Sequence, residues 1–367
     1  MTGSEKKILN RPELKQHIEC LSEDFHKGHL TLYLGAGVSR GSGLPNWNTL
    51  IATLYYVAVD ADWYPKWKAY PNYLYALGEW LLSRSGESPE VATGKVASYF
   101  GSRTGFENKF KEALYLPWKN EFGNDLSLPS KESLRAGNGL LDAVAKLCEA
   151  TKDAAGLHAV VTTNYDSLLE ISLKGGCADQ KFKPIWKTAD MLTESQKGIF
   201  HVHGYLPPIG KGSPFDEIML TEAQYHGAAN DPYSWSNLTL IQCFSTSSGL
   251  MVGMSMADRN LRRLLHALQR TPLRKRQYVF LKEPDVPIMT PCDRDHVAKQ
   301  AQEYLESFQG SGIKHHHNLQ EDMEYILNEL VRQEKSMAMS AMDEMGVTPL
   351  WVNDYSEIPV ILNAIRA

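Results

Sequence analysis

The feature that most constrains the fold is a short apolar segment that stops abruptly at a glycine. Residues 30–34 (LTLYL) are followed at once by Gly35, and segments of the same form occupy residues 159–163, 200–203 and 250–253. A short apolar run before a tight turn is typical of a strand that is buried on both faces of a parallel sheet. The chain is therefore predicted to be built on such a sheet.

Helical patterns separate these segments. Residues 13–27 predict an amphipathic helix whose apolar side is formed by Leu14, Ile18, Leu21 and Phe25. Residues 278–281 and 347–352 have the composition of later strands. Strands that alternate with helices favour right-handed crossovers, so the prediction is an α/β fold: a Rossmann-like parallel sheet with helices on both faces.

Residues 47–148 interrupt this alternation. They are rich in Trp, Tyr, Leu and Ala, and Asn46 is placed to cap a first helix. The prediction is a large helical insertion after the first strand that covers the ligand-binding edge of the sheet. It divides the chain into an inserted subdomain, 47–148, and a Rossmann-like domain formed by 1–46 and 149–367.

A second helical stretch is predicted at residues 293–342, and it contains three consecutive histidines, His315 to His317. Consecutive residues on a helix point in different directions, which favours a polar surface over a metal site. Metal binding remains the alternative for this run, whose role the sequence does not assign.

Charge and composition narrow the function. The chain of 367 residues has a net charge of -5, so nucleic acid is not expected as a general partner. Residues 259–276 form a local basic cluster. This cluster is interpreted as a solvated helix face or an assembly surface, with a phosphate-rich ligand or nucleic acid as the alternative.

The cysteines and the N-terminus bear on location and metal content. The five cysteines are scattered without a C-x-x-C pair, which argues against a disulfide framework and a structural zinc site. The N-terminus lacks a secretory apolar core, and no run approaches the roughly 18 apolar residues of a membrane helix. A cytoplasmic protein without metal is expected.

The strongest motif is GAGVS at residues 35–39, directly after the first apolar segment. Glycines allow a tight turn and a close approach of the backbone to a pyrophosphate, and the following helix start offers free N–H groups. A plain turn is the competing interpretation of the motif.

Two more loops have the same character. The segment GLPNW brings Pro45 and Trp47, which are able to fold over a bound cofactor. The segment GMSMAD brings Gly253 and Ser255, whose backbone and hydroxyl suit phosphate or ribose. Asp258, at the end of the same segment, is interpreted as the N-cap of the next helix.

A polar pair follows the second apolar segment, in the motif TTNYD. Asn164 and Asp166 stand at the predicted carboxyl end of a strand, the edge at which open α/β sheets bind ligands. Asn164 suits a carboxamide or a ribose hydroxyl, and Asp166 suits the same ligand. The alternative is that the pair only caps a helix.

Two histidines end the third segment, in the motif HVHG. On an extended strand, His201 and His203 would face the same side. His203, beside Gly204, is the candidate general base because an imidazole titrates near neutral pH. A structural role is the alternative for His203 and the expectation for His201.

Taken together and in this order, GAGVS with GLPNW, TTNYD, HVHG and GMSMAD resemble the sirtuin-like superfamily. The segment GVTPLWVNDY at residues 346–355 resembles its closing strand. The resemblance implies NAD as the ligand. The glycine loop would hold its pyrophosphate through Gly35, Ala36, Gly37 and Ser39, and Gly253 and Ser255 would contact the cofactor further along. Asn164 and Asp166 would serve the nicotinamide and its ribose, and His203 would match the catalytic histidine.

The chain departs from the deacylating sirtuins in two places. Their four-cysteine zinc module is missing, because only Cys243 lies between His203 and Gly253. Asn46-Trp47-Asn48 also replaces the Asp-Phe-Arg loop usual in deacylating members. The Tyr in TTNYD and the Trp in GLPNW are instead similar to the sirtuin-like domains of bacterial antiphage systems, which hydrolyse NAD.

This resemblance implies an NAD glycohydrolase that releases nicotinamide and ADP-ribose and depletes cellular NAD in abortive infection. Catalysis would fall to Asn164, His203 and Asp166. The resemblance further implies gating by homo-oligomerisation or by a separate defence protein, such as an ATPase or an Argonaute-like protein. The alternatives are an NAD-dependent protein deacylase and a non-catalytic NAD- or nucleotide-binding sensor. The trigger and any cyclised product are not readable from the sequence.

Overall fold

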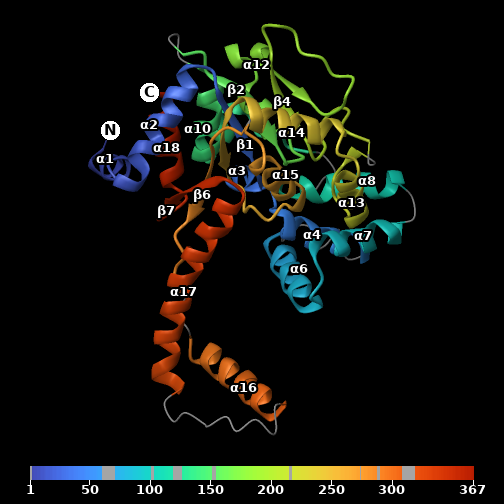
Figure 1. The fold of residues 1–367 in the computed structure, drawn as a ribbon. Coiled ribbons are helices and arrows are strands. Elements are labelled where there is room, and N and C mark those ends of the chain that lie inside the picture. The colour runs from blue at the N-terminus through green and yellow to red at the C-terminus, as the bar shows by residue number, and fades with distance from the viewer. Residues whose placement is uncertain are drawn as a thin grey trace.

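A computed structural model describes residues 2–59, 71–100, 103–118, 126–150, 154–214, 217–272, 274–286, 290–307 and 319–367. Its centre is a seven-stranded parallel sheet with the strand order β3-β4-β2-β1-β5-β6-β7 (Figure 1). The strands are β1 (Leu30–Leu34), β2 (Leu157–Thr162), β3 (Phe182–Ile185), β4 (Lys197–His201), β5 (Ser248–Val252), β6 (Gln277–Lys282) and β7 (Val347–Val352).

Helices connect the strands and surround the sheet. Before and directly after β1 lie α1 (Gly3–Leu9), α2 (Pro12–His26) and α3 (Ala36–Arg40). Between α3 and β2 lie α4 (Trp47–Val59), α6 (Pro71–Ser85), α7 (Pro89–Phe100), α8 (Arg103–Leu114), η1 (Leu116–Trp118), α9 (Lys131–Gly137) and α10 (Gly139–Cys148). The later helices are α11 (Leu168–Leu173), α12 (Cys177–Lys181), α13 (Glu222–Asn230), α14 (Trp235–Thr246), α15 (Arg259–Gln269), α16 (Pro291–Ser307), α17 (Leu319–Glu344) and α18 (Glu357–Arg366).

The order of the strands places β1 at the point where the chain changes direction across the sheet. The chain builds β2, β3 and β4 on one side of β1, and β5, β6 and β7 on the other. In doubly wound sheets this switch point, at the carboxyl ends of the strands, is where ligands bind. The predicted Rossmann-like parallel sheet is confirmed.

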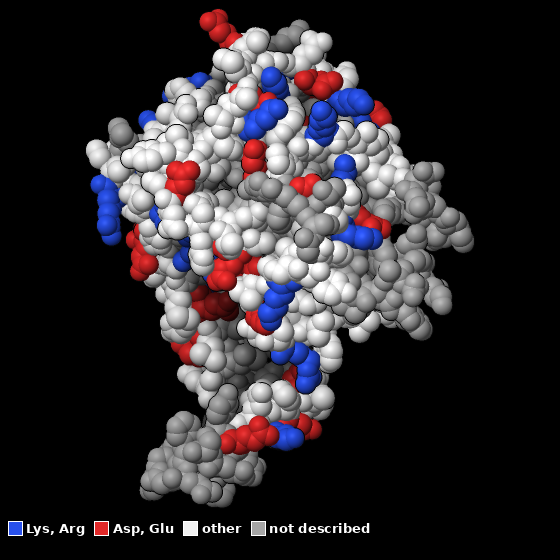
Figure 2. Space-filling model, turned by 90° about the vertical axis from the view of Figure 1, so that its right-hand side faces the viewer, with Lys and Arg blue, Asp and Glu red and all other residues white. Residues whose placement is uncertain are grey.

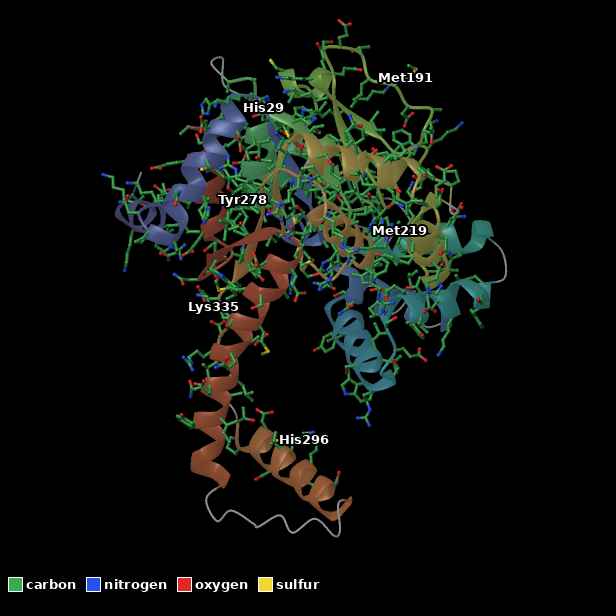
Figure 3. All side chains as sticks on the ribbon, in the orientation of Figure 1. His29, Met191, Met219, Tyr278, His296 and Lys335 are labelled. Atoms are coloured by element: carbon green, nitrogen blue, oxygen red, sulfur yellow. The ribbon has the colours of Figure 1, made fainter. Side chains whose placement is uncertain are left out.

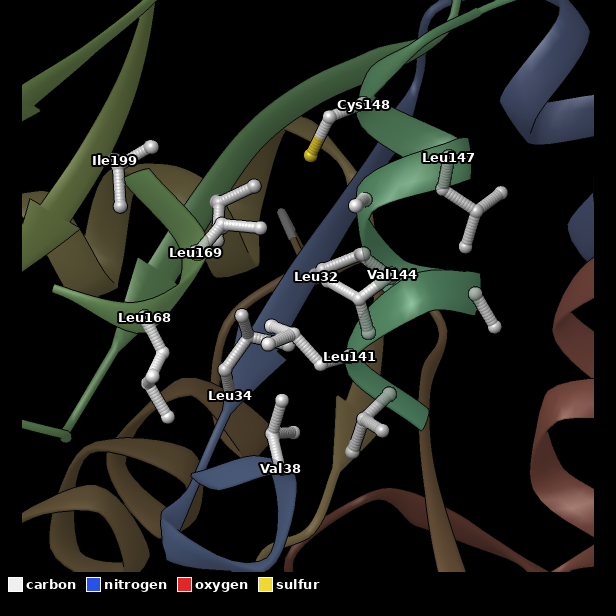
Figure 4. Close-up of a cluster of buried hydrophobic side chains, with 14 of the residues drawn as sticks. Leu32, Leu34, Val38, Leu141, Val144, Leu147, Cys148, Leu168, Leu169 and Ile199 are labelled. Atoms are coloured by element: carbon white, nitrogen blue, oxygen red, sulfur yellow. The ribbon is translucent and has the colours of Figure 1, made fainter. Parts of the chain in front are cut away.

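Alternate side chains of each strand enter two separate cores. On one face, Leu32 and Leu34 of β1 pack against α10, as Figure 4 shows, in a core that α2, α11 and α18 also enter. On the other face, Tyr33 packs with α14 and α15 and stacks on Phe244, with 4.8 Å between ring centroids. Strands buried on both faces explain why the sequence shows continuous apolar runs and not alternation.

The helices between β1 and β2 fall into two groups. Helices α4, α6, α7 and α8 pack on one another and gather beside the end of the sheet at which β1 leads into α3 (Figure 1). Helices α9 and α10 instead pack on α11, and α10 also packs on α18. Asn46 accepts a hydrogen bond from the Thr49 amide at 2.9 Å and so caps α4, as the sequence predicts.

The C-terminal helical stretch forms an extension of the molecule. Helix α17 runs away from the body, and α16 lies beside its distant part (Figure 1). The histidine run His315 to His317 lies outside the described residues. In the part of the chain that the structure describes, no helix is long and apolar enough to cross a membrane.

Two features differ from the sequence-based expectation. The edge strand β3 was not expected, since four residues that include Pro184 give little apolar signal. The prediction that His201 and His203 face one side of a strand is wrong, because β4 ends at His201. The Gly204 amide then donates to the His201 carbonyl at 3.1 Å, which turns the chain and separates the two rings.

Candidate functional site

The carboxyl ends of four adjacent strands lie in register. Leu34 of β1 pairs with Thr162 of β2 and with Val252 of β5, and Thr162 pairs with His201 of β4. Each of the four sequence motifs therefore continues from the same edge of the sheet. This edge is the candidate site, and its members come from positions up to 223 residues apart (258 minus 35).

The two glycine loops are interlocked through their backbones. The Gly35 amide donates to the Val252 carbonyl at 3.0 Å, and the Gly37 amide donates to the Gly253 carbonyl at 2.9 Å. A Cβ atom at Gly37 would lie 2.7 Å from the Gly253 Cα, and Gly253 has a φ of +67°. Loop-to-loop packing therefore requires these glycines. Of the successive amides of Gly35, Ala36 and Gly37, only that of Ala36 is left for a ligand.

A chain of directed hydrogen bonds fixes Asn164. Its amide nitrogen donates to the Gly35 carbonyl and to the Ser39 hydroxyl, both at 3.0 Å. Ser39 in turn donates to Oδ2 of Asp166 at 2.8 Å, while Oδ1 of Asp166 accepts from the Leu168 amide at 3.0 Å. With its nitrogen held by two acceptors, Asn164 presents its side-chain oxygen as the group for a ligand.

This chain gives Asp166 and Ser39 internal partners. Both side chains are buried, at 7% and 3% exposure, and burial raises the pKa of the Asp166 carboxyl against the lowering effect of its hydrogen bonds. The geometry agrees with the capping interpretation of the TTNYD motif, because Asp166 accepts from the Leu168 amide at the start of α11, and it gives Asp166 a second partner in Ser39. It places Asp166 behind Asn164.

His203 lies in a second buried cluster. Its Nε2 is 3.2 Å from Oδ2 of Asp258, and its ring meets the edge of Tyr225 with 6.0 Å between centroids. The Tyr225 hydroxyl donates to the same Oδ2 at 3.2 Å. Burial lowers the pKa of His203, and the Asp258 carboxylate raises it, with a net lowering. A neutral imidazole at neutral pH is the form that can accept a proton.

His201 has a separate structural environment. Its Nδ1 lies 3.1 Å from the Asn164 carbonyl and its Nε2 lies 2.7 Å from Oε1 of Glu170. A carbonyl only accepts, so Nδ1 carries a proton and supports the backbone beneath Asn164. A cavity of about 20 Å³, enough for one water, adjoins this group, and Oε2 of Glu170 is buried without a partner. His201 is the satisfied core residue that the sequence predicts.

The GLPNW loop and the insertion meet at Tyr165. Its ring lies 6.0 Å from that of Trp47 and 5.3 Å from that of Phe110 in α8. Its hydroxyl donates at 2.6 Å to the carbonyl of Met219, which lies on the side of the molecule where α13 and α8 are found (Figure 3). Pro45 is buried and Trp47 is half-buried.

The β5 loop presents one exposed hydroxyl next to a strained residue. Ser255 is exposed, and Met256 is buried with a φ of 57°. Among the residues that the structure describes, Met256 is the one non-glycine residue with a positive φ. Its carbonyl accepts from Arg262 at 3.3 Å, which helps to hold a backbone conformation that costs roughly 1–3 kcal/mol. Strain of this kind concentrates at ligand-binding loops.

Charge at the surface is mixed. Figure 2 shows Lys and Arg interspersed with Asp and Glu on the face that it presents. In the basic cluster 259–276, Arg263 donates to Asn260 and Arg276 pairs with Asp24. Among the described residues no group of three or more His, Cys, Asp and Glu side chains is placed to hold a metal ion.

Sequence reasoning missed Asp258 and Tyr225 as members of the candidate site. It assigned Asp258 only a capping role, which the structure confirms through a 2.6 Å hydrogen bond from the Leu261 amide. The contacts of Asp258 with His203 and Tyr225 depend on the packing of α13 and α15, and no local pattern announces them. The only available signal was an acidic residue at a strand-to-helix turn.

Comparison with known families agrees with the motifs. Residues 158–308 match the family model of the SIR2-like domain. This range holds Asn164, His203 and Gly253, whereas β1 and the first glycine loop precede it. No curated protein matches the chain. This match supports the resemblance of residues 158–308 to the sirtuin-like superfamily and is compatible with NAD-related activity.

Proposed function

We propose that the protein hydrolyses NAD at the bond between nicotinamide and ribose. The observation that carries this proposal is the register of β1, β2, β4 and β5. It brings a glycine loop, a carboxamide and an imidazole of lowered pKa to one edge of the sheet. That edge is also the switch point of the sheet.

The phosphates of NAD would lie over the two interlocked loops. The Ala36 amide and the exposed Ser255 hydroxyl are donors that this surface offers, and Gly35, Gly37 and Gly253 let the two loops pack closely enough to present them together. Pro45 and Trp47 would cover the cofactor from the side of the insertion.

The reaction breaks the bond from the ribose C1′ to the nicotinamide nitrogen, and nicotinamide leaves with the bonding electron pair. Oxocarbenium-like charge then develops on the ribose, and the oxygen of a water molecule adds to C1′. The side-chain oxygen of Asn164 would accept from a ribose hydroxyl or from that water. His203 would take the proton that the water loses, which leaves ADP-ribose as the second product.

The test is turnover of NAD by the purified protein, with nicotinamide and ADP-ribose quantified. Asn164→Ala and His203→Ala are each expected to lower the rate by about 10²–10⁴. Asn363→Ala and His226→Ala are matched controls, since both side chains are exposed on α18 and α13, and both should retain wild-type rates. Equal turnover in all five proteins would refute the assignment of the site.

The competing activities give different results in the same assay. A protein deacylase would consume NAD only when an acylated peptide is supplied. A non-catalytic NAD sensor would be stabilised by NAD against thermal unfolding in the wild type, with no product under any condition.

We further propose that this activity serves antiphage defence by depleting NAD and that assembly or a partner protein controls it. Three apolar side chains on one side of α17 support an assembly role. Ile326, Leu330 and Met337 are 50%, 58% and 61% exposed. Full NADase activity from a strict monomer in light scattering would contradict this control. Unchanged cellular NAD during phage infection of cells that express the protein would contradict the defence role.

A further inference from the structure

The Asp258 carboxylate is held from three directions. One oxygen, Oδ1, accepts from the Leu261 amide at the start of α15, at 2.6 Å. The other, Oδ2, accepts from the Tyr225 hydroxyl of α13 and lies 3.2 Å from Nε2 of His203. A capping bond and a phenol thus fix the position of a negative charge against one nitrogen of a buried imidazole.

This arrangement assigns different tasks to the two nitrogens of His203. An ionised carboxylate accepts and cannot donate, so it favours the tautomer with the proton on Nε2. The lone pair is then on Nδ1, for which the described residues supply no partner. The imidazole is only 5% exposed and Tyr225 closes one edge of the ring, so its orientation is restricted.

We infer that Asp258 and Tyr225 are positioning residues that orient His203 and set its protonation, so that Nδ1 acts as the base. This inference rests on the proposed NAD hydrolysis for its kinetic consequences, but the protonation of His203 is measurable without any turnover.

The other titratable groups around the cluster do not change charge in the same pH range. Burial, and then Asp258, raise the pKa of Tyr225 far above its usual range, and Tyr165 and Glu90 of α7 add to the effect. Burial, Asp258 and Glu90 likewise raise the pKa of Tyr165. Both phenols therefore stay protonated at and below neutral pH.

Two substitutions should shift the pKa of His203 in opposite directions. Asp258→Asn keeps a good capping residue and the shape of the side chain but removes the charge, so the pKa of His203 should fall. Tyr225→Phe keeps the ring beside His203 but removes the donor to Asp258, so the carboxylate becomes a stronger acceptor and the pKa of His203 should rise. Asp354→Asn is the matched control, because Asp354 accepts from the Ser356 amide near α18.

The first measurement is an NMR titration of isotope-labelled histidine, with the His203 signal identified among the 12 histidines by its loss in His203→Gln. A downward shift in Asp258→Asn and an upward shift in Tyr225→Phe are expected, with none in Asp354→Asn. An unchanged titration in Asp258→Asn would overturn the inference, whether or not the protein cleaves NAD.

The second measurement is the pH profile of kcat/KM for NAD. Activity rises with pH as His203 loses its proton, so the acidic limb should move to lower pH in Asp258→Asn, with a rate loss of about 10- to 100-fold. It should move to higher pH in Tyr225→Phe. A loss of rate without any movement of the limb would mean that Asp258 only caps α15. A wild type without turnover even when assembled and supplied with its partner would instead refute the proposed function.

Discussion

Ser39, a residue predicted to touch phosphate, can act on the site by holding the side chain of Asn164 in position. Its hydroxyl accepts from Asn164 and donates to Asp166, so it transmits the orientation of a buried carboxylate to the carboxamide at the surface of the site. Removal of the hydroxyl would leave the amide nitrogen of Asn164 with the Gly35 carbonyl as its acceptor and would leave Oδ2 of the buried Asp166 without its donor.

Ser39→Ala is therefore expected to lower the free energy of unfolding by about 1–3 kcal/mol, the cost of leaving such groups unsatisfied. It should also lower kcat for NAD hydrolysis while the affinity for NAD changes little. Urea denaturation and steady-state kinetics measure both effects. Ser98→Ala is the control, because the Ser98 hydroxyl is exposed on α7 and bonds only to the Gly94 carbonyl. Equal stability and kinetics in the two variants would exclude the role given to Ser39.

Single residues also show where the sequence stops being informative. Asn164 and His203 could be singled out because each follows an apolar run, and the structure brings both to one edge. The partnership of Ser39 with Asp166 spans 127 positions and depends on the register of β1 with β2. Only the assembled sheet determines that register.

At the scale of elements, the two glycine loops behave as one unit. A methyl group at Gly253 would lie 2.7 Å from the Val38 amide nitrogen, and the residue has a φ of +67°. Gly253→Ala should therefore destabilise the protein by about 2–4 kcal/mol, from the left-handed conformation together with the overpacking.

Thermal unfolding with and without NAD measures this effect, and the variant should also lose most of the stabilisation by NAD. Gly94→Ala is the matched control, since no atom lies within 4 Å of the added methyl group and alanine favours the helix. Wild-type behaviour of Gly253→Ala would show that the loops can separate at little cost.

The strands differ in how well the sequence predicted them, for physical reasons. The boundaries of β1 and β7 were predicted at the observed residues, because each is an apolar run that ends sharply. The pattern also identified α2, whose four buried residues are Leu14, Ile18, Leu21 and Phe25. The edge strand β3 and the turn after His201 are set by neighbouring strands, and such contacts leave no periodic signal.

At the scale of the whole molecule, the helices between β1 and β2 hold the loops of the sheet edge. Tyr115 donates to the Leu206 carbonyl at 2.8 Å, and Trp118 donates to the Ser42 carbonyl at 3.2 Å. Together with Phe110 against Tyr165, these contacts tie loops from β1, β2 and β4 to one helical group. The division into two domains remains a prediction.

The pH dependence of stability reflects histidines with a lowered pKa in several parts of the fold. Burial lowers the pKa of His17, His158 and His203 below the usual value of about 6.5. The unfolded chain then binds more protons than the folded one, so stability is complete above pH 6.5 and declines as the pH falls below it. Urea denaturation from pH 7.5 to 5.5 should show this decline.

The contribution of His203 can be separated by substitution. His203→Gln should reduce the slope of stability against pH, whereas His226→Gln, on the exposed side of α13, should leave it unchanged. A slope that is the same in wild type and His203→Gln would mean that His203 binds the same number of protons in the folded and the unfolded protein at these pH values.

The interlocked loops have one more consequence. Gly35, whose amide bonds to β5, also offers its carbonyl to Asn164, so a single residue joins the loop proposed to bind phosphate to the carboxamide proposed to take part in the chemistry. A displacement of this loop by a bound diphosphate would reach Asn164 through Gly35. We expect adenosine diphosphate and nicotinamide, offered as separate fragments, to bind cooperatively, each raising the affinity for the other by the same factor. In calorimetric titrations, independent binding of the two fragments would show that Gly35 carries no such coupling.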